Sequence, residues 1–190
     1  MSRLCFLYGT VHARKTKSAY AIRNRFLKYH LSTMIMAPTT THQDDISNYD
    51  YLIGKEENIF LTIKRQFNSL RLILIDDANL LNEVQVDQLL QVAISQNIAI
   101  ICFGLRTDFR TGEFPGAKRL LEIAQVVKEI PTRCTCGNKA LFNVRKENGK
   151  TTFSGTQIKQ GQEITYEALC PKCYYHKVMQ YKKLKESGIL

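Results

Sequence analysis

An apolar run near the N-terminus ends at Gly9 and is followed, after five residues, by a lysine–threonine pair that opens a helical pattern. Residues 5–16 read CFLYGTVHARKT. A phosphate-binding loop consists of a strand, a loop whose backbone N–H groups point inward, and a Lys-Ser/Thr pair at the start of a helix. Its template, G-x-x-x-x-G-K-[ST], is matched except that Arg14 replaces the second glycine. The stretch therefore predicts a strand–loop–helix unit that binds a nucleotide, with backbone strain or a changed loop path at Arg14.

Apolar runs and helical patterns alternate along the first 130 residues. Strands are expected at 3–8, 32–36, 72–75, 98–103 and 125–130. Helices are expected at 15–29, 55–67, 82–95 and 115–124. Residues 39–50 are polar and are expected to be irregular. The alternation predicts the α/β class, as a three-layer P-loop domain with a parallel sheet.

The strand expected at 72–75 is wholly apolar (LILI) and ends in two carboxylates, Asp76 and Asp77. Buried parallel strands present ligand-binding groups at their carboxyl ends. In an enzyme that uses a nucleoside triphosphate, Asp76 would hold Mg²⁺ and Asp77 would accept a proton from a substrate hydroxyl. Lys15 would then reach the β- and γ-phosphates, with Thr16 on Mg²⁺. An ordinary helix N-cap before Leu80 is the alternative interpretation of the two carboxylates.

Four of the six cysteines form two close pairs separated by about 30 residues. Cys5 and Cys102 lie inside apolar runs and are expected in the core. Between the pairs, segments 140–145 and 151–154 flank an Asn-Gly turn and predict a hairpin. Two knuckles joined by a hairpin suit one tetrahedral, structural Zn²⁺ ion in a small zinc-ribbon subdomain. His176 is either a spare ligand or a surface residue. The expected metal ligands are Cys134, Cys136, Cys170 and Cys173.

The length of 190 residues and the hydrophobic content of 44% suit one main domain with a small appendage. We expect a nucleotide-binding domain at 1–130 and a zinc-binding subdomain with a basic tail at 131–190. The formal charge is +10, and from residue 131 onward 11 Lys and Arg face 4 Asp and Glu, a difference of +7. This charge suits phosphate-bearing ligands or nucleic acid, or belongs to a solvated tail. No apolar run approaches the roughly 20 residues that span a bilayer, and no targeting segment is evident, which predicts a cytoplasmic protein without membrane contact.

Together these features resemble the type II thymidine kinase family, and its phage and bacterial branch in particular. The shared features are the phosphate loop, the carboxylate-bearing strand, a Gly-Leu-x-x-x-Phe loop at 104–109 (GLRTDF), and a zinc-held lasso. The resemblance implies transfer of a phosphoryl group from ATP to the 5′-hydroxyl of thymidine or deoxyuridine. It also implies Mg²⁺ as cofactor, a structural Zn²⁺ and a homotetramer.

The resemblance also implies roles for individual residues. In the family a D-E-x-Q-F segment follows the central strand and its Glu is the general base; the match here is DDANL, so Asp77 takes the catalytic role with a shorter side chain. The implied thymidine-binding residues are Leu80, Leu105, Phe109, Phe114 and the lasso residue Tyr166. The implied ATP-binding residues are Gly9, Thr10, Val11, His12, Ala13, Arg14, Lys15, Thr16, Asp76, Asp77, Ala78 and Asn79, of which Thr16 and Asp76 hold Mg²⁺.

The departures from the family pattern gather at catalytic positions. The family's K-P-A-x-D-x-R stretch appears as APTTTHQ at 37–43, without its Asp and Arg. With Arg14, Asp77 and Asn79, this leaves open a nucleotide-binding relative that senses or assembles instead of catalysing. A third reading is a nucleic-acid-binding zinc module, based on the basic tail in which tyrosines alternate with lysines. The tyrosines concerned are Tyr174, Tyr175 and Tyr181.

Overall fold

The computed structural model describes residues 3–41, 47–67, 69–159, 161 and 163–188. The chain forms two compact units. The sheet unit contains the chain through Tyr8, Arg14–Arg106 and Phe114–Glu129. The cysteine unit contains Gly9–Ala13, Thr107–Glu113 and the chain from Ile130 onward.

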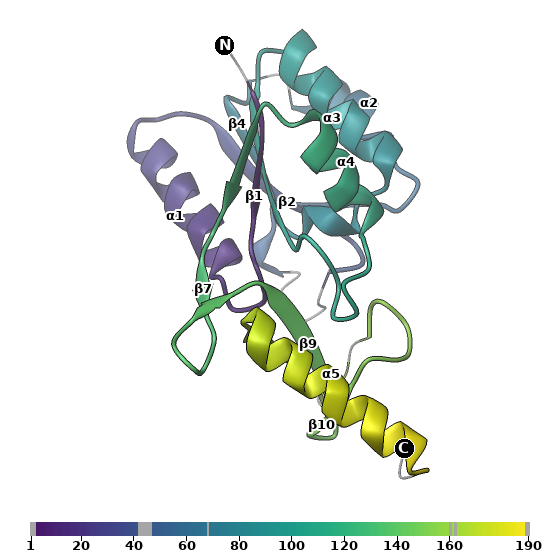
Figure 1. Cartoon of the computed structure of the whole chain (residues 1–190). Coiled ribbons are helices and arrows are strands. Elements are labelled where there is room, and N and C mark those ends of the chain that lie inside the picture. Colours follow the sequence, from purple (N-terminus) through teal and green to yellow (C-terminus); the bar gives the residue numbers. More distant parts are fainter. Residues whose placement is uncertain (1–2, 42–46, 68, 160, 162, 189–190) are drawn as a thin grey trace. The chain divides into compact units, whose positions relative to one another are not determined.

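The sheet unit is built on a six-stranded parallel sheet with the order β3-β2-β4-β5-β1-β6. Its strands are β1 (Leu4–Tyr8), β2 (Thr33–Pro38), β3 (Tyr51–Ile53), β4 (Leu72–Ile75), β5 (Ala99–Gly104) and β6 (Val126–Glu129). Its helices are α1 (Lys15–Lys28), α2 (Ile59–Gln66), the short 3₁₀-helix η2 (Ala78–Leu80), α3 (Glu83–Ser95) and α4 (Pro115–Ile123). Helix α1 covers one face of the sheet and α2, α3 and α4 cover the other (Figure 1). The predicted three-layer α/β fold with a parallel sheet is confirmed.

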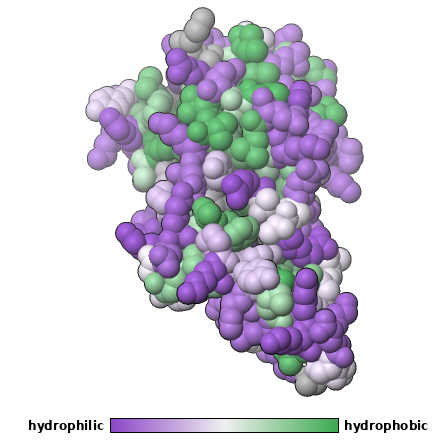
Figure 2. Space-filling model, viewed as in Figure 1, coloured by the Kyte–Doolittle hydropathy of each residue, from purple (hydrophilic) through white to green (hydrophobic). Residues whose placement is uncertain are grey.

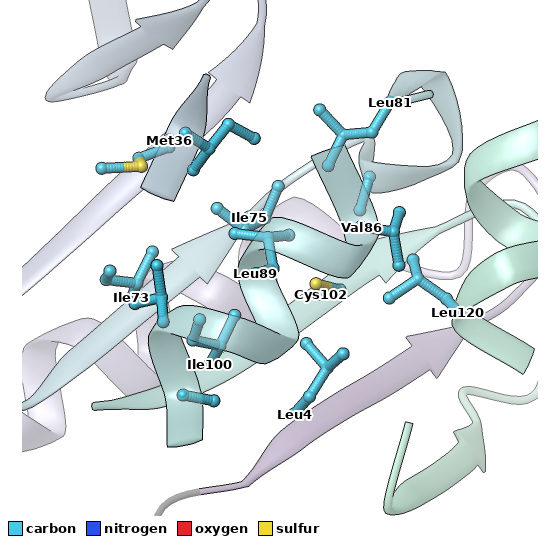
Figure 3. Close-up of a cluster of buried hydrophobic side chains, with 14 of the residues drawn as sticks. Leu4, Met36, Ile73, Ile75, Leu81, Val86, Leu89, Ile100, Cys102 and Leu120 are labelled. Carbon is cyan, nitrogen blue, oxygen red and sulfur yellow. The ribbon is translucent and has the colours of Figure 1, made fainter. Parts of the chain in front are cut away.

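The core of the sheet unit lies between the sheet and helices α3 and α4. All four residues of β4 are buried, because the strand lies inside the sheet with a helical layer on each face. Each fully buried Leu or Ile contributes about 1.5–3 kcal/mol relative to an exposed one. Figure 3 shows aliphatic side chains from the strands meeting those of the helices. Its labelled residues include Leu4, Ile73, Ile75, Ile100, Val86, Leu89 and Leu120.

Local signals fix where the helices begin. Asn82 caps α3 by accepting a hydrogen bond from the Gln85 N–H (2.8 Å), and the Gln85 side chain returns a bond to the Asn82 N–H. Asn58 caps α2 in the same position, so this helix starts later than the expected residue 55. Pro115 stands at the first position of α4, where its missing N–H costs nothing.

The cysteine unit holds two small antiparallel sheets and one long helix. Its elements are β7 (Thr132–Arg133), β8 (Lys139–Ala140), β9 (Phe142–Glu147), β10 (Lys150–Thr152), β11 (Ile164–Leu169) and α5 (Pro171–Glu186). Asn148 and Gly149 both have positive φ, 49° and 75°, which matches the twist of a two-residue hairpin turn. The predicted hairpin is confirmed in β9 and β10, and β11 pairs with the other edge of β9.

Three further features differ from the expectation. Strand β2 runs on through Ala37 and Pro38, and the Thr39 N–H then donates to Ile53 O of the edge strand β3. Strand β3 was not predicted, because three residues are too few to show a period. Helix α5 was taken for a basic tail, although Pro171 marks its first turn.

The surface of α5 follows from its lysines. Lys182, Lys183 and Lys185 are exposed, and Figure 2 shows mainly hydrophilic side chains over the C-terminal half of this helix. Within the described residues, no helix has both the length and the apolar content required to cross a membrane. Of the segment 39–50 that was expected to be irregular, residues 42–46, including His42 and Gln43, lie outside the described residues.

Candidate active site and cysteine cluster

The phosphate loop begins at a glycine that tolerates no side chain. A Cβ atom on Gly9 would lie 2.7 Å from Ala13 Cβ and 2.8 Å from the Ile130 carbonyl oxygen. Backbone atoms at that distance do not yield, so the close approach requires glycine here. The loop also contains a hydrogen bond from the Ala13 N–H to Thr10 O, at 3.3 Å.

The loop ends at Arg14, whose backbone lies in the left-handed region at φ 56° and ψ 34°. Of the two possibilities raised by the missing glycine, the structure adopts backbone strain. A non-glycine residue pays about 1–2 kcal/mol for this conformation. Arg14 is the N-cap of α1 but its side chain makes no capping hydrogen bond, so the strain is not offset by a cap.

Lys15, Thr16, Asp76 and Asp77 form one electrostatic cluster within the sheet unit. The Thr16 hydroxyl donates to the Asp76 carboxylate, and the Tyr49 hydroxyl donates to Asp76 Oδ2 at 3.2 Å. Burial raises the pKa of Asp76, and the neighbouring Asp77 raises it further. Burial lowers the pKa of Lys15, against the attraction of Asp77 and Asp76. The charged groups at the start of α1 and at the carboxyl end of β4 therefore interact with one another.

Asp77 has a partner that the sequence did not indicate. Thr41 Oγ1 donates to Asp77 Oδ2, with the two atoms 2.5 Å apart. Asp77 has φ 48° and occupies the N-cap position of η2, but its side chain makes no capping hydrogen bond. The interpretation of this carboxylate as an ordinary helix cap is therefore wrong.

Residues 104–114 follow β5 and contain three of the expected thymidine-binding residues; this segment, the predicted nucleoside loop, starts at a close contact with η2. Asn79 Oδ1 accepts a hydrogen bond from the Leu105 N–H at 2.9 Å, and a Cβ on Gly104 would lie 2.9 Å from the same oxygen. Asn79 and Ala78 are buried. Asn79 therefore holds the start of this loop, a function that its place among the expected ATP-binding residues did not suggest.

The expected thymidine-binding residues fall into two groups. Leu80, Leu105 and Phe114 belong to the hydrophobic cluster of the sheet unit. Phe109 and Tyr166 belong to the cysteine unit. The Arg145 guanidinium, which is fully buried, lies 3.9 Å from the centroid of the Phe109 ring.

Arg145 also orders the lasso segment after β10. Its Nη1 donates to Thr156 O at 2.6 Å and its Nη2 to Ser154 O at 2.7 Å. Within the loop 107–113, Asp108 Oδ1 accepts a hydrogen bond from the Gly112 N–H at 2.7 Å. Arg145 also pairs with Glu147 Oε1 at 2.9 Å. No sequence pattern marked Arg145, because its other partners are backbone carbonyls and a ring that is distant in sequence.

The four predicted cysteine ligands lie together. Their Sγ atoms are all within 4.8 Å of one another, and those of Cys136 and Cys170 are 3.6 Å apart. Zn–S bonds of about 2.3 Å in a tetrahedron place sulfurs about 3.8 Å apart, so the donor set fits Zn²⁺. Hydrogen bonding to the peptide groups of Cys136 and Cys170 lowers the pKa of Cys134 to about 6. Within the described part of the chain His176 is not a member of this group.

Comparison with known proteins gives the family. The family model described as thymidine kinase matches residues 2–174. Over 186 residues the chain is 32% identical to the thymidine kinase of Chromobacterium violaceum, covering 93% of this chain and 100% of that protein. It is 37% identical to the thymidine kinase of Mannheimia succiniciproducens over 182 residues, covering 90% and 93%.

Among solved structures, the Pif1 helicase from Candida albicans is similar at 16% identity and a TM-score of 0.46. The match covers 68% of this chain and 36% of that one, so the chain spans about a third of the helicase. The sequence relatives, in contrast, match over almost their whole length. The chain belongs to the thymidine kinase family.

Proposed function

We propose that this chain transfers the γ-phosphoryl group of ATP to the 5′-hydroxyl of thymidine or deoxyuridine and releases ADP and the nucleoside monophosphate. The family match over residues 2–174 supports the reaction. The observation that carries the chemistry is the hydrogen bond from Thr16 to Asp76, with Lys15 close enough to both carboxylates to interact with them. Phosphoryl transfer from a triphosphate uses groups of these kinds: a positively charged group, a hydroxyl group and two carboxylates.

Each member of the cluster has a proposed role. Lys15 neutralises charge on the β- and γ-phosphates, and Asp77 takes the proton of the 5′-hydroxyl. Thr16 and Asp76 hold Mg²⁺, which when bound supplies further charge neutralisation at the phosphate oxygens. Rate enhancement comes mainly from positioning and electrostatic stabilisation.

The remaining assignments belong to the same proposal. We assign residues 9–16 and 76–79 to ATP binding, and Leu80, Leu105, Phe109, Phe114 and Tyr166 to nucleoside binding. The four cysteines bind one structural Zn²⁺ ion. We also propose a nucleotide-binding domain at 1–130 and a zinc-binding domain at 131–190, with the short loops 9–13 and 107–113 of the first stretch grouped with the second. A homotetramer and a cytoplasmic location belong to the same proposal. Family membership does not favour the two alternatives drawn from the sequence, a non-catalytic relative and a nucleic-acid-binding module.

The test is the reaction itself. Purified protein is incubated with ATP, Mg²⁺ and either thymidine or deoxyuridine, and the monophosphate is separated by chromatography. The control is Lys15→Ala, which removes the cation of the cluster. We expect product from the wild type and little from the control. Equal, background-level product from both proteins would contradict the proposed reaction.

Thermal unfolding with ATP separates the non-catalytic alternative from failure to bind. A ligand at 100 times its Kd stabilises the folded state by about 2.7 kcal/mol. A rise in Tm with ATP but no monophosphate would favour the nucleotide-binding relative. A rise in Tm together with product supports the kinase.

A further inference from the structure

One buried amide side chain connects two of the loops that the reaction depends on. Asn143 lies on β9 and is 4% exposed. Its Oδ1 accepts a hydrogen bond from the Val11 N–H at 2.9 Å, and its Nδ2 donates to Thr107 O at 3.0 Å. Val11 belongs to the phosphate loop and Thr107 begins the 107–113 part of the predicted nucleoside loop. All three residues belong to the cysteine unit.

A second contact joins the phosphate loop to Tyr166, one of the expected thymidine-binding residues. His12 Nε2 donates to the backbone carbonyl of Tyr166, with 2.9 Å between N and O. Tyr166 lies on β11, which pairs with β9. Two residues further along β11, Ala168 lies directly opposite Asn143 of β9. The phosphate loop therefore has two hydrogen bonds to one small sheet, one from each of two consecutive residues.

These contacts restrict how the phosphate loop moves. The Val11 N–H is bonded to Asn143, so the position of this part of the loop is set by β9. A displacement of Val11 that breaks the bond leaves a buried amide oxygen without its donor, which is costly in a site shielded from water. A displacement that keeps the bond carries Asn143 along, and with it the bond to Thr107.

We propose that Asn143 is a positioning residue that couples the phosphate loop to the nucleoside loop, so that ATP and thymidine bind with linked affinities. This inference rests on the proposed function, because it assigns one ligand to each loop. The coupling is reciprocal. If the nucleotide changes the affinity for thymidine by a given factor, thymidine changes the affinity for the nucleotide by the same factor. A nucleotide that fixes residues 9–13 fixes Thr107 and Tyr166 in the same step.

The test measures the coupling factor. Thymidine is titrated calorimetrically into the full-length protein, with and without a saturating non-hydrolysable ATP analogue and Mg²⁺. In the wild type we expect the analogue to tighten thymidine binding about 5- to 150-fold, the usual range for coupled sites. In Asn143→Leu, which keeps the side-chain size but loses both hydrogen bonds, we expect a factor near one. A wild-type-like factor in this variant would overturn the proposal.

A matched control separates coupling from stability. Asn82→Ala removes the N-cap of α3 in the sheet unit and is expected to lower Tm while leaving the coupling factor at its wild-type value. A factor that falls equally in Asn82→Ala would overturn the specific role of Asn143, because stability alone would then explain the loss.

A second variant decides the question if Asn143→Leu does not fold. His12 is exposed and has φ 62°, a conformation that asparagine tolerates. In His12→Asn the shorter side chain does not reach Tyr166 O, and we expect the coupling factor to fall at least twofold. An unchanged factor there would overturn the proposal.

Failure of the inference and of the proposed function give different results. A wild type that phosphorylates thymidine but shows a coupling factor of one contradicts the role of Asn143 alone. A wild type that neither binds nor phosphorylates thymidine contradicts both.

Discussion

Thr41 and Asp77 are joined by a hydrogen bond of 2.5 Å from the threonine hydroxyl to the carboxylate. Thr41 is buried, at 2% exposed, and lies in the stretch where the family pattern carries an aspartate. The bond fixes the position of one oxygen of the carboxylate. Thr41 therefore orients the Asp77 carboxylate, which is the proposed general base.

We expect Thr41→Val to lower kcat about ten- to hundredfold, because misplacement of a catalytic group by about 1 Å costs roughly a hundredfold in rate. Thr41→Ser is the matched control, since it keeps the hydroxyl, and should retain most of the activity. Steady-state kinetics with thymidine at saturating ATP checks this. Wild-type kcat in Thr41→Val would show that the bond does not position the base.

Asp77→Asn should lower kcat about 100- to 10,000-fold, the usual contribution of a general base. ATP binding, measured by thermal shift, should remain. The control is Asp87→Asn on α3, an exposed carboxylate that pairs with Arg119. If Asp77→Asn and Asp87→Asn had equal activity, the assignment of Asp77 as base would be wrong.

Arg14→Gly should raise the free energy of unfolding by about 1 kcal/mol, because glycine adopts the left-handed conformation without a Cβ clash. Removal of a cation from the positive end of α1 adds a few tenths of a kcal/mol. Arg14→Ala keeps the Cβ and removes the charge, so the two variants together separate these causes. Denaturant unfolding curves give the comparison. Equal stabilisation by alanine and glycine would assign the effect to charge instead of backbone conformation.

The stability of the sheet unit should depend on the ionisation of Asp76. Its pKa is raised above its ordinary value of 3.8, first by burial and second by Asp77. The folded state therefore binds this proton more tightly than the unfolded state does. The stabilisation of the folded state that results is complete below pH 3.8 and is lost as the pH rises through the raised pKa.

Asp76→Asn mimics the protonated carboxyl at every pH. We therefore expect this variant to be more stable than the wild type near neutral pH, with a difference that shrinks as the pH falls toward 4. Lys15 is present in both proteins, so the pH dependence of the difference reports on Asp76. Melting temperatures measured without nucleotide from pH 4 to 8 provide the test, and a difference that grows on acidification would contradict it.

Cys170→Ser should abolish zinc binding and unfold the cysteine unit. Binding to structural zinc sites in small domains is worth about 10–16 kcal/mol, and that free energy is largely folding free energy. We expect one Zn²⁺ per wild-type chain by metal analysis and less than a tenth of that in the variant. Cys5→Ser, in β1 and outside the cluster, is the control and should keep the ion. Loss of zinc from both variants would point to general instability.

The sequence predicts the parts of the fold that carry local signals. The all-apolar β4, helix α3 and the Asn148–Gly149 turn appear in the structure where they were expected. Helix α5 was missed because lysines dominate its sequence while its packing depends on two tyrosines. The Tyr174 ring stacks on Phe142 at 4.6 Å between centroids, and Tyr181 meets Phe153. Such contacts between segments distant in sequence leave no periodic pattern.

The site divides in the same way. Lys15, Thr16 and the two aspartates follow from a template with fixed spacing and come together in one cluster. Tyr49 and Asn143 belong to no template, and at Thr41 the family pattern carries a different residue. Each of the three finds its partner in a part of the chain that is distant in sequence. Their contribution is visible only once the chain has folded.

The backbone passes between the two units five times, at the residues on either side of 9–13, on either side of 107–113 and before 130. The cysteine unit is therefore not formed by one continuous segment of the chain. A fragment cut at residue 130 would carry the Asn143 amide without Val11 or Thr107, and the Tyr166 carbonyl without His12. A C-terminal third exchanged between distant relatives would lose these hydrogen-bond partners unless the two short internal loops were exchanged with it.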